Sequence, residues 1–433
     1  MTSKLQFVYE QIDLPLIPCL VEMEQTGCLI DIPKLLSIGK QLDARLIHVH
    51  DCIQFMAGDA INLDSPAQVA ALLYDRLGLP LPRKHGVATR STDKAALAGL
   101  LGRHPIVEPL AEYRRLTKLK STYVDKIPQV LSTDGRLRSH FNATRVETGR
   151  LSSSDPINLQ NIPVRAEPGT PESVQQVVRQ IRQAWIPSSG NVLVIFDQSQ
   201  VEYRILACMA QDAELIELYK SGIDVHSATA ARYIGIGVYE FDQRRKQGDV
   251  QCKSMRDLAK NVNYGWAYGQ TSDGLAAWGN ANGIPMTNKQ AASIQQGMAR
   301  TPIVRYIQQA KSKIRRTGYA ETYFGRQAYY ADLQSDKPWE LARALREGFN
   351  MTIQGTAADV MKQAMTRIRT RRLKEGLTAR QILAVHDEVV YDTPVEEADR
   401  LSRIMVEEAE HVVDWAIPLS IDVKVVHSWG EGK

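Results

Sequence analysis

Two stretches of the chain have the apolar pattern of buried β-strands that end beside carboxylates. Residues 191–197 contain five consecutive apolar residues followed by Asp197. In residues 381–392, two runs of apolar and β-branched residues flank a His-Asp-Glu break, which predicts a strand, a tight turn and a returning strand. We therefore expect two strands that each bring an aspartate to one edge of a sheet.

Helical spacing dominates the N-terminal part, residues 12–130. Apolar residues recur at helical spacing through Leu14–Met23, Gly27 is expected to end that helix, and Cys28–Asp31 resembles a short strand. Leu35–Met56 predicts a long amphipathic helix. This part of the chain is therefore expected to be mainly helical.

Basic residues gather in two places within that helical part. Arg83–Arg90 reads as a basic turn, and Glu112–Tyr123 predicts a helix with a basic, aromatic-flanked face that carries Lys118 and Lys120. Such a face is usually just solvated surface. Lysine and arginine also neutralise phosphates regardless of base sequence, so both interpretations stay open from the pattern alone.

Small and amide residues crowd the stretch Thr148–Pro163. This composition predicts a loop with exposed hydrogen-bonding groups. Three amides, Asn158, Gln160 and Asn161, follow Arg150 closely. A loop that only holds a core together rarely needs this set, which favours a functional role.

After Asp197 the pattern is helical for roughly 150 residues. Within it Arg256, Lys260, Tyr264 and Tyr268 recur every four positions and form one stripe along a helix. Two cations followed by two aromatic rings match a nucleoside triphosphate lying along that face. Spacing alone favours an ordinary amphipathic helix with snorkelling cations and packed tyrosines, and only the neighbouring carboxylate strands favour the nucleotide.

A second stripe comes later, at Arg346, Asn350 and Gln354. These long hydrogen-bonding side chains are compatible with a plain helix surface. They are equally compatible with contacts in a minor groove, where donors meet acceptors that are common to all base pairs.

The carboxylates suggest metal chemistry. Acidic side chains gathered at strand ends suit hard divalent cations such as Mg²⁺. Asp197 and Asp387 at one sheet edge would hold two metal ions about 4 Å apart, the geometry for in-line phosphoryl displacement. Taken alone, residues 381–392 are just as compatible with an exposed acidic hairpin turn.

Composition narrows the classes without choosing one. The 433 residues are 44% hydrophobic and 24% charged, with a net charge of +4, which permits a polyanionic partner. No apolar run approaches membrane-spanning length, and the N-terminus lacks the apolar core of a secretory signal. Five scattered cysteines without CxxC spacing indicate reduced thiols rather than a zinc site or a disulfide framework.

Five motifs, taken in order, resemble those of the family A DNA polymerases, the bacterial DNA polymerase I group. They are TGRLSSSDP followed by NLQNIP, DQSQVEYR, RxxxKxxxYGxxYG, QGTAAD and HDE. The likeness runs from about Ile12 to Trp429, and Lys118–Tyr123 resembles the family's thumb. Single motifs of this kind are weak, but five in register are not a chance similarity.

The resemblance implies an α+β fold of right-hand shape, with an antiparallel-sheet palm, helical fingers and a helical thumb. It implies an N-terminal segment packing on the palm at 1–35, a thumb at 36–130 and fingers at 207–350. The palm is expected in two parts, at 131–206 and 351–433.

The same resemblance assigns roles to individual residues. It implies catalytic roles for Asp197, Asp387, Glu388 and Lys260, and metal ligation by Asp197, Asp387 and the backbone carbonyl of Gln198. It implies nucleotide contacts for Arg256, Lys260, Tyr264, His226, Glu202 and Gln200, with Glu202 placed where a ribose 2′-hydroxyl would go. It implies DNA contacts for Arg150, Asn158, Gln160, Asn161, Tyr268, Arg346, Asn350, Gln354, His386, Lys118 and Lys120.

Three stretches depart from the family pattern. Ile157 is an extra residue that is expected to bulge the loop before its amides, and residues 142–147 leave their template contacts in doubt. Residues 235–254 are longer and more polar than the usual lead into the nucleotide helix. None of these changes touches the expected metal ligands.

The resemblance implies template-directed, primer-dependent DNA synthesis with two Mg²⁺ ions, which Mn²⁺ can replace. The expected partners are a primer–template duplex and dNTPs, with a separate exonuclease or processivity factor as a further partner, and the expected enzyme is monomeric. Because few residues precede the family-like start at Asp13, no proofreading or 5′ nuclease domain is expected in this chain. The expected location is the cytoplasm of a bacterial or phage-type system, with an organelle as the alternative.

Two other classes remain as alternatives. A single-subunit RNA polymerase would share the metal strands, but Glu202 and the loop of Arg150 favour deoxynucleotides and primed synthesis. A non-catalytic DNA-binding subunit would be expected to lose Asp197 or Asp387, and both are present.

Overall fold

The computed structural model describes residues 3–84, 87–163, 172–298 and 301–432. The chain divides into two compact units, each built from separate stretches of sequence. The four-stranded unit comprises residues 1–27, 140–154 and 187–426. The three-stranded unit comprises residues 28–139, 155–186 and 427–433.

An antiparallel sheet with the strand order β11-β12-β8-β13 forms the centre of the four-stranded unit. Its strands are β8 (Asn191–Gln198), β11 (Arg380–Val385), β12 (Glu388–Pro394) and β13 (Ile421–Val426). The strand, turn and returning strand predicted for 381–392 are therefore confirmed, as is the strand before Asp197. Leu193, Val194 and Phe196 of β8 are fully buried, which explains why this run is apolar at successive positions.

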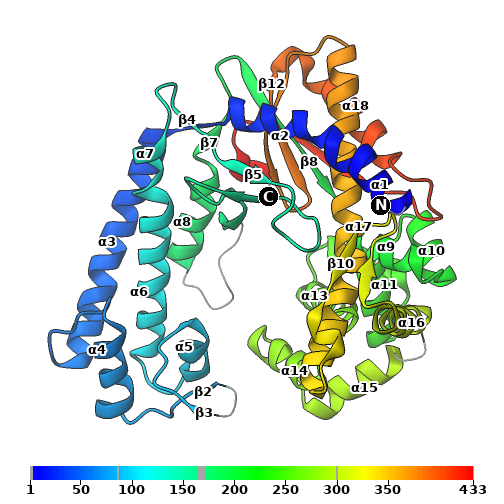
Figure 1. The fold of residues 1–433 in the computed structure, drawn as a ribbon. Coiled ribbons are helices and arrows are strands. Elements are labelled where there is room, and N and C mark those ends of the chain that lie inside the picture. Colours follow the sequence, from blue (N-terminus) through cyan, green and yellow to red (C-terminus); the bar gives the residue numbers. More distant parts are fainter. Residues whose placement is uncertain (1–2, 85–86, 164–171, 299–300, 433) are drawn as a thin grey trace. The chain divides into compact units, whose positions relative to one another are not determined.

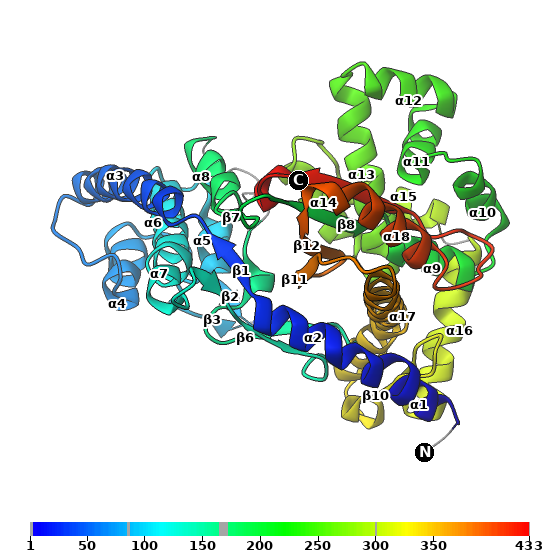
Figure 2. The same cartoon turned by 90° about the horizontal axis from the view of Figure 1, so that it is seen from above.

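Helices cover this sheet. The 37-residue helix α17 (Pro338–Lys374) and α18 (Ala398–Glu410) pack on each other, and α18 also packs on β8 and β13. Helix α2 (Leu14–Thr26) packs on β11 and α17 and ends at Gly27, whose φ of 66° is in the left-handed region. Figure 1 shows α17 extending away from the strands, and Figure 2 shows it end-on.

Helices fill most of the chain between β8 and α17. They are α9 (Val201–Met209), α10 (Ala213–Lys220), α11 (Val225–Ile234), α12 (Val238–Lys246), α13 (Val250–Ala267), α14 (Ser272–Ala281), α15 (Asn288–Met298) and α16 (Pro302–Thr317). The polar stretch 235–254 contains α12, whose only buried residue is Phe241, and the start of α13.

The expectation of roughly 150 helical residues was wrong at the end of this stretch. Gly318 ends α16 at a φ of 80°, and a hairpin follows, with strands β9 (Tyr319–Glu321) and β10 (Gln327–Tyr329). Its three-residue strands are too short for a two-residue alternation to stand out in the sequence. A second short hairpin pairs β5 (His140–Asn142) with β6 (Ser152–Ser154).

Two long helices organise the three-stranded unit. Helix α3 (Ile32–Ala57) packs against α6 (Val107–Leu119), which continues into a π-helical turn at Lys120–Val124. The Asp31 side chain accepts a hydrogen bond from the Lys34 amide at 2.9 Å and caps the start of α3. The long helix predicted for 35–56 is thus confirmed and begins one turn earlier.

The rest of this unit consists of short elements. The sheet order is β4-β1-β7, with β1 at Cys28–Ile30, β4 at Arg136–Leu137 and β7 at Trp185–Ile186. The shorter helices are α4 (Pro66–Ala70), α5 (Lys94–Leu100), α7 (Ile127–Val130) and α8 (Glu172–Arg182). The predicted basic turn at 83–90 forms the strands β2 (Arg83–Lys84) and β3 (Val87–Ala88), and residues 85–86 lie outside the described residues.

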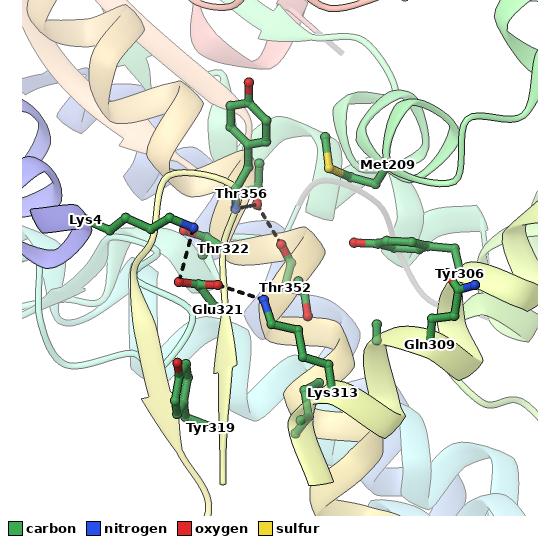
Figure 3. A pocket seen from close by; sticks show the side chains of 13 residues that line it. Lys4, Met209, Tyr306, Gln309, Lys313, Tyr319, Glu321, Thr322, Thr352 and Thr356 are labelled. Carbon is green, nitrogen blue, oxygen red and sulfur yellow. Dashed lines mark hydrogen bonds and ion pairs between the residues drawn. The ribbon is translucent and has the colours of Figure 1, made fainter. Parts of the chain in front are cut away.

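A cavity of about 320 Å³ lies in the four-stranded unit between α9, α16, α17 and the β9–β10 hairpin. Figure 3 shows Glu321 on its wall between Lys4, at 3.6 Å, and Lys313, at 2.8 Å. None of the predicted site residues lines it.

None of the five cysteines forms a disulfide. Within the part of the chain that the structure describes, no helix is both long and apolar enough to cross a membrane.

We expect Leu193→Ala to lower the free energy of unfolding by about 2–5 kcal/mol, because a buried leucine leaves a cavity in the central strand. Val425→Ala on β13, where the side chain is 47% exposed, should cost no more than about 0.5 kcal/mol. Urea denaturation followed by circular dichroism measures both. Equal shifts of the two transition midpoints would contradict the assignment of β8 as the core strand.

Candidate active site

Antiparallel pairing brings the predicted carboxylates to one sheet edge. Asp197, near the end of β8, lies directly opposite Glu388, the first residue of β12. The Gln198 amide donates to the Asp387 carbonyl at 3.0 Å, so Asp387 lies beside the same strand end. His386 makes the turn with a φ of 55°, a conformation that non-glycine residues seldom adopt.

Glu388 does not occupy the exposed turn that the sequence suggested. It belongs to β12 and is only 4% exposed. His386 is exposed and Asp387 is half-buried, so Glu388 is the residue that departs from an exposed acidic hairpin.

A pair of aspartates is the kind of protein ligand set that Mg²⁺ usually has, because this ion rarely binds in a cage made only of protein ligands. Among the residues that the structure describes, no group of three or more His, Cys, Asp or Glu side chains is arranged to hold a metal ion. Mg²⁺ is usually held by one or two carboxylates and keeps its other positions for water and substrate phosphates. Asp197 and Asp387 at neighbouring strand ends meet that requirement.

Helix α13 carries most of the predicted nucleotide stripe. Arg256, Lys260 and Tyr264 lie within it, and Tyr268 follows one residue after its end. The Tyr268 amide still donates to the Tyr264 carbonyl at 3.0 Å, so the helical turn continues. Lys260 is exposed to solvent.

Arg256 is held by a partner that the sequence analysis missed. Its guanidinium donates to both Asp224 oxygens, at 2.7 and 3.0 Å. Asp224 also caps α11 through Ser227 and accepts from the Gln200 amide side chain at 3.2 Å. Burial would raise the pKa of Asp224, but the hydrogen bonds from Arg256 and Ser227 outweigh it and hold that pKa well below its ordinary value.

His226 lies in an aromatic cluster with Tyr203 and Tyr264. The three ring centroids are 5.5–5.7 Å apart, and His226 is 1% exposed. The His226 Nδ1 lies 3.0 Å from the Asn263 side-chain nitrogen, which donates to it, so Nε2 carries the proton. That Nε2 is buried without a hydrogen-bond partner.

Glu202, at the start of α9, connects two other predicted residues. One of its carboxylate oxygens accepts from Arg150 and the other accepts from the Tyr268 hydroxyl. Burial raises the pKa of Tyr264, and the charges of Glu202 and Asp387 raise it further. The carboxylate edge, α9 and α13 therefore share one electrostatic environment.

The second stripe lies on α17, where Arg346, Asn350 and Gln354 all occur. A Cβ built on Gly269 would lie 2.9 Å from the Arg346 Cδ, so α17 meets the chain just after Tyr268. The side-chain oxygen of Asn350 is buried without a partner.

The remaining predicted DNA contacts belong to the three-stranded unit. Asn158 caps the short 3-10 helix Leu159–Asn161 by accepting from the Gln160 amide at 3.0 Å. The extra residue Ile157 is buried, and its carbonyl accepts from the Ser139 hydroxyl at 2.9 Å.

The two lysines of this unit differ. Lys118 is exposed. Lys120 forms ion pairs with Asp43 and Asp125, and its hydrogen bond with Asp125 raises its pKa. Of the two, Lys118 is the better placed to meet a phosphate.

Comparison with known proteins identifies the family. The model of DNA polymerase family A matches residues 33–431, and the chain belongs to this family. This result and the α+β fold confirm the resemblance seen in the motifs.

The curated relatives are bacterial. The chain is 37% identical over 434 residues to the thermostable DNA polymerase I of Thermus aquaticus, covering all of this chain and 49% of that protein. It is 33% identical over 430 residues to DNA polymerase I of Bacillus subtilis, covering 98% and 46%. The chain thus spans about half the length of these relatives.

A solved structure is similar throughout. The polymerase domain of Pol1 from M. smegmatis, in complex with DNA primer-template and dNTP, superposes with a TM-score of 0.86 and 31% sequence identity. The match covers 98% of this chain and 71% of that one.

Burial lowers the pKa of His226 from 6.5 to about 4, although Asp224 opposes the shift. The unfolded chain therefore binds more protons between those pH values, and stability should rise with pH across that window. Protonation linked to His226 should lower the free energy of unfolding by about 2 kcal/mol at pH 5 relative to pH 7. Urea unfolding at both pH values checks this. His226→Gln should remove that part of the pH dependence, whereas His140→Gln, at an exposed position, should retain it.

Proposed function

We propose that this chain catalyses template-directed, primer-dependent DNA synthesis from dNTPs. The observation that carries the proposal is the meeting of Asp197 and Asp387 at one sheet edge, in the same unit as helix α13 and in a member of DNA polymerase family A. The similar Pol1 domain was solved with a primer-template and dNTP, which supports the same substrates here.

Asp197 and Asp387 are the proposed ligands of two Mg²⁺ ions. Bound there, the ions would supply a more nucleophilic primer 3′-hydroxyl and charge neutralisation at the transferring phosphate. Glu388 is buried in β12, where it pairs with Val385 of β11 and with Asp197 of β8. This pairing keeps the two aspartates at neighbouring strand ends. His386 shapes the turn that presents Asp387.

The triphosphate would meet α13 through Lys260 first, because Lys260 is exposed whereas Arg256 is held by Asp224. Arg256 already uses Nε and Nη2 to bond that carboxylate, so it can offer its whole guanidinium to phosphate only by releasing Asp224. The protonated Nε2 of neutral His226 offers a third donor once the buried aromatic cluster opens.

The sugar would be selected by Glu202 and Tyr264. Glu202 is fixed by Arg150 and the Tyr268 hydroxyl, so its carboxylate cannot readily move aside for a 2′-hydroxyl. A fixed, charged group that a competing substrate would have to displace is an effective device for rejecting it.

The DNA contacts divide between the two units. Arg150, Tyr268, Arg346, Asn350 and Gln354 belong to the four-stranded unit, and Lys118, Asn158, Gln160 and Asn161 belong to the three-stranded unit. We assign the latter contacts to a thumb and the adjoining loop, as the motif order predicts.

Asp387→Asn should lower the rate of primer extension by about a thousandfold or more while leaving primer–template affinity nearly unchanged, because the amide removes charge from the metal site without altering its shape. Primer extension gels and fluorescence anisotropy measure the two quantities. Asp399→Asn, at an exposed position of α18, is the matched control and should extend normally. Extension by Asp387→Asn at a tenth of the wild-type rate would refute the metal assignment.

Glu202→Ala should raise incorporation of ribonucleotides relative to deoxynucleotides by about tenfold or more, because the space beside the 2′ position is then open. Single-nucleotide incorporation kinetics give the ratio of kcat/KM values. Glu214 is an exposed residue of α10 that forms an ion pair with Arg232. Glu214→Ala should leave the ratio unchanged. An unaltered ratio in Glu202→Ala would place sugar selection elsewhere.

A further inference from the structure

Four charged side chains form a buried cluster in the four-stranded unit. Arg326 donates to Asp359 at 2.8 Å and to both oxygens of Asp13, at 2.9 and 2.7 Å. Lys362 donates to Asp13 at 2.9 Å. Asp359 is 0% exposed and Lys362 is 1% exposed, whereas Asp13 and Arg326 are partly exposed. Two positive and two negative charges therefore balance each other in a largely buried cluster.

The hairpin that carries Arg326 is fixed to α17. The Thr322 hydroxyl donates to Asp359 at 2.9 Å and accepts from the Arg326 amide at 3.0 Å. The Tyr323 amide donates to the Thr356 hydroxyl at 2.9 Å, and Figure 3 shows Thr322 and Thr356 close together there. The backbone of Arg326 is therefore as constrained as its guanidinium.

The Arg326 guanidinium packs against the backbone of Gly149. A Cβ built on Gly149 would lie 2.7 Å from the Arg326 Nε and 2.8 Å from its Cδ. Gly149 has a φ of 72°, which glycine adopts at little cost. The preceding residue is also held, because a Cβ on Gly355 of α17 would lie 3.0 Å from the Thr148 carbonyl oxygen.

The next residue after this supported turn is Arg150, which donates to Glu202. A contiguous series of contacts therefore leads from the buried charges to the proposed sugar-selecting carboxylate. It runs from Asp13 and Asp359 through Arg326, Gly149 and Arg150 to Glu202.

We propose that Arg326, fixed by Asp13 and Asp359, is a positioning residue that sets the Arg150 turn and through it contributes to the selection of deoxyribonucleotides. The inference rests on the proposed DNA polymerase function and extends it to a residue that need not touch either substrate. Geometry explains why the residue is arginine. Only a planar guanidinium group, with N–H donors on all three nitrogens, can bond two carboxylates at once and still pack flat against the glycine backbone.

The variant Arg326→Lys keeps the positive charge and loses the planar guanidinium group. It should lower the ratio of kcat/KM for dNTP to that for rNTP by about fivefold, because Arg150 then no longer holds Glu202 in one position. Gly149→Ala leaves every charge of the cluster in place and should lower the ratio in the same direction. If Arg326→Lys does not fold, Gly149→Ala decides the question.

A double-mutant cycle with Glu202→Ala separates positioning from a general loss of structure. If Arg326 acts through Glu202, adding Arg326→Lys to Glu202→Ala should change the ratio by less than about twofold. Arg343→Lys is the control and should leave the wild-type ratio unaltered. Arg343 lies on α17 and forms an ion pair with Asp332, outside that helix.

Three outcomes would overturn the proposal. The ratio could stay unchanged in Arg326→Lys and Gly149→Ala, or Arg326→Lys could lower it equally with and without Glu202. In both cases the proposed role of Arg326 fails. The proposed DNA polymerase function still holds if the wild-type chain extends primers. A wild-type chain that extends no primer would overturn both.

Discussion

The antiparallel register between β8 and β12 is the constraint on which the site depends. Side chains on a strand alternate between faces, so a slip of one residue would send every side chain of β12 to the other side of the sheet. With Asp197 opposite Glu388, Asp387 lies next to the end of β8. Leu193, Phe196 and Tyr391 are fully buried in these strands, and a slip would break their packing with the surrounding core. The geometry of the carboxylate edge is in this sense a property of the apolar core.

Hydrophobic periodicity predicted the parts of the fold that are long or strongly patterned. Helix α3, strand β8 and the β11–β12 hairpin all follow from it, and the structure confirms them. The β9–β10 hairpin was missed because its short strands are stabilised by contacts with α17 through Thr322 and Thr356. Such contacts depend on tertiary packing and leave no local pattern in the sequence.

Residue types at the site were easier to predict than their pairing. Helical spacing singled out Arg256 and the family resemblance singled out His226. Neither gave any sign that Asp224 holds the arginine from 32 positions away or that the histidine is buried. An aspartate just before a helix could have been recognised as a cap; its second role could not. The roles of the individual site residues remain predictions.

The four-stranded unit is assembled from three separated stretches of the chain, and this has a consequence for biosynthesis. Asp392 of β12 bonds to Asn191 of β8, 201 positions earlier, and α2 joins the sheet through β11 from the opposite end of the sequence. Pairings between distant residues form slowly because a long loop must close first. A ribosome must therefore release the chain beyond β12 before Asp197 and Asp387 can meet, and until then the apolar strand β8 lacks the sheet partners β12 and β13 and is exposed to aggregation.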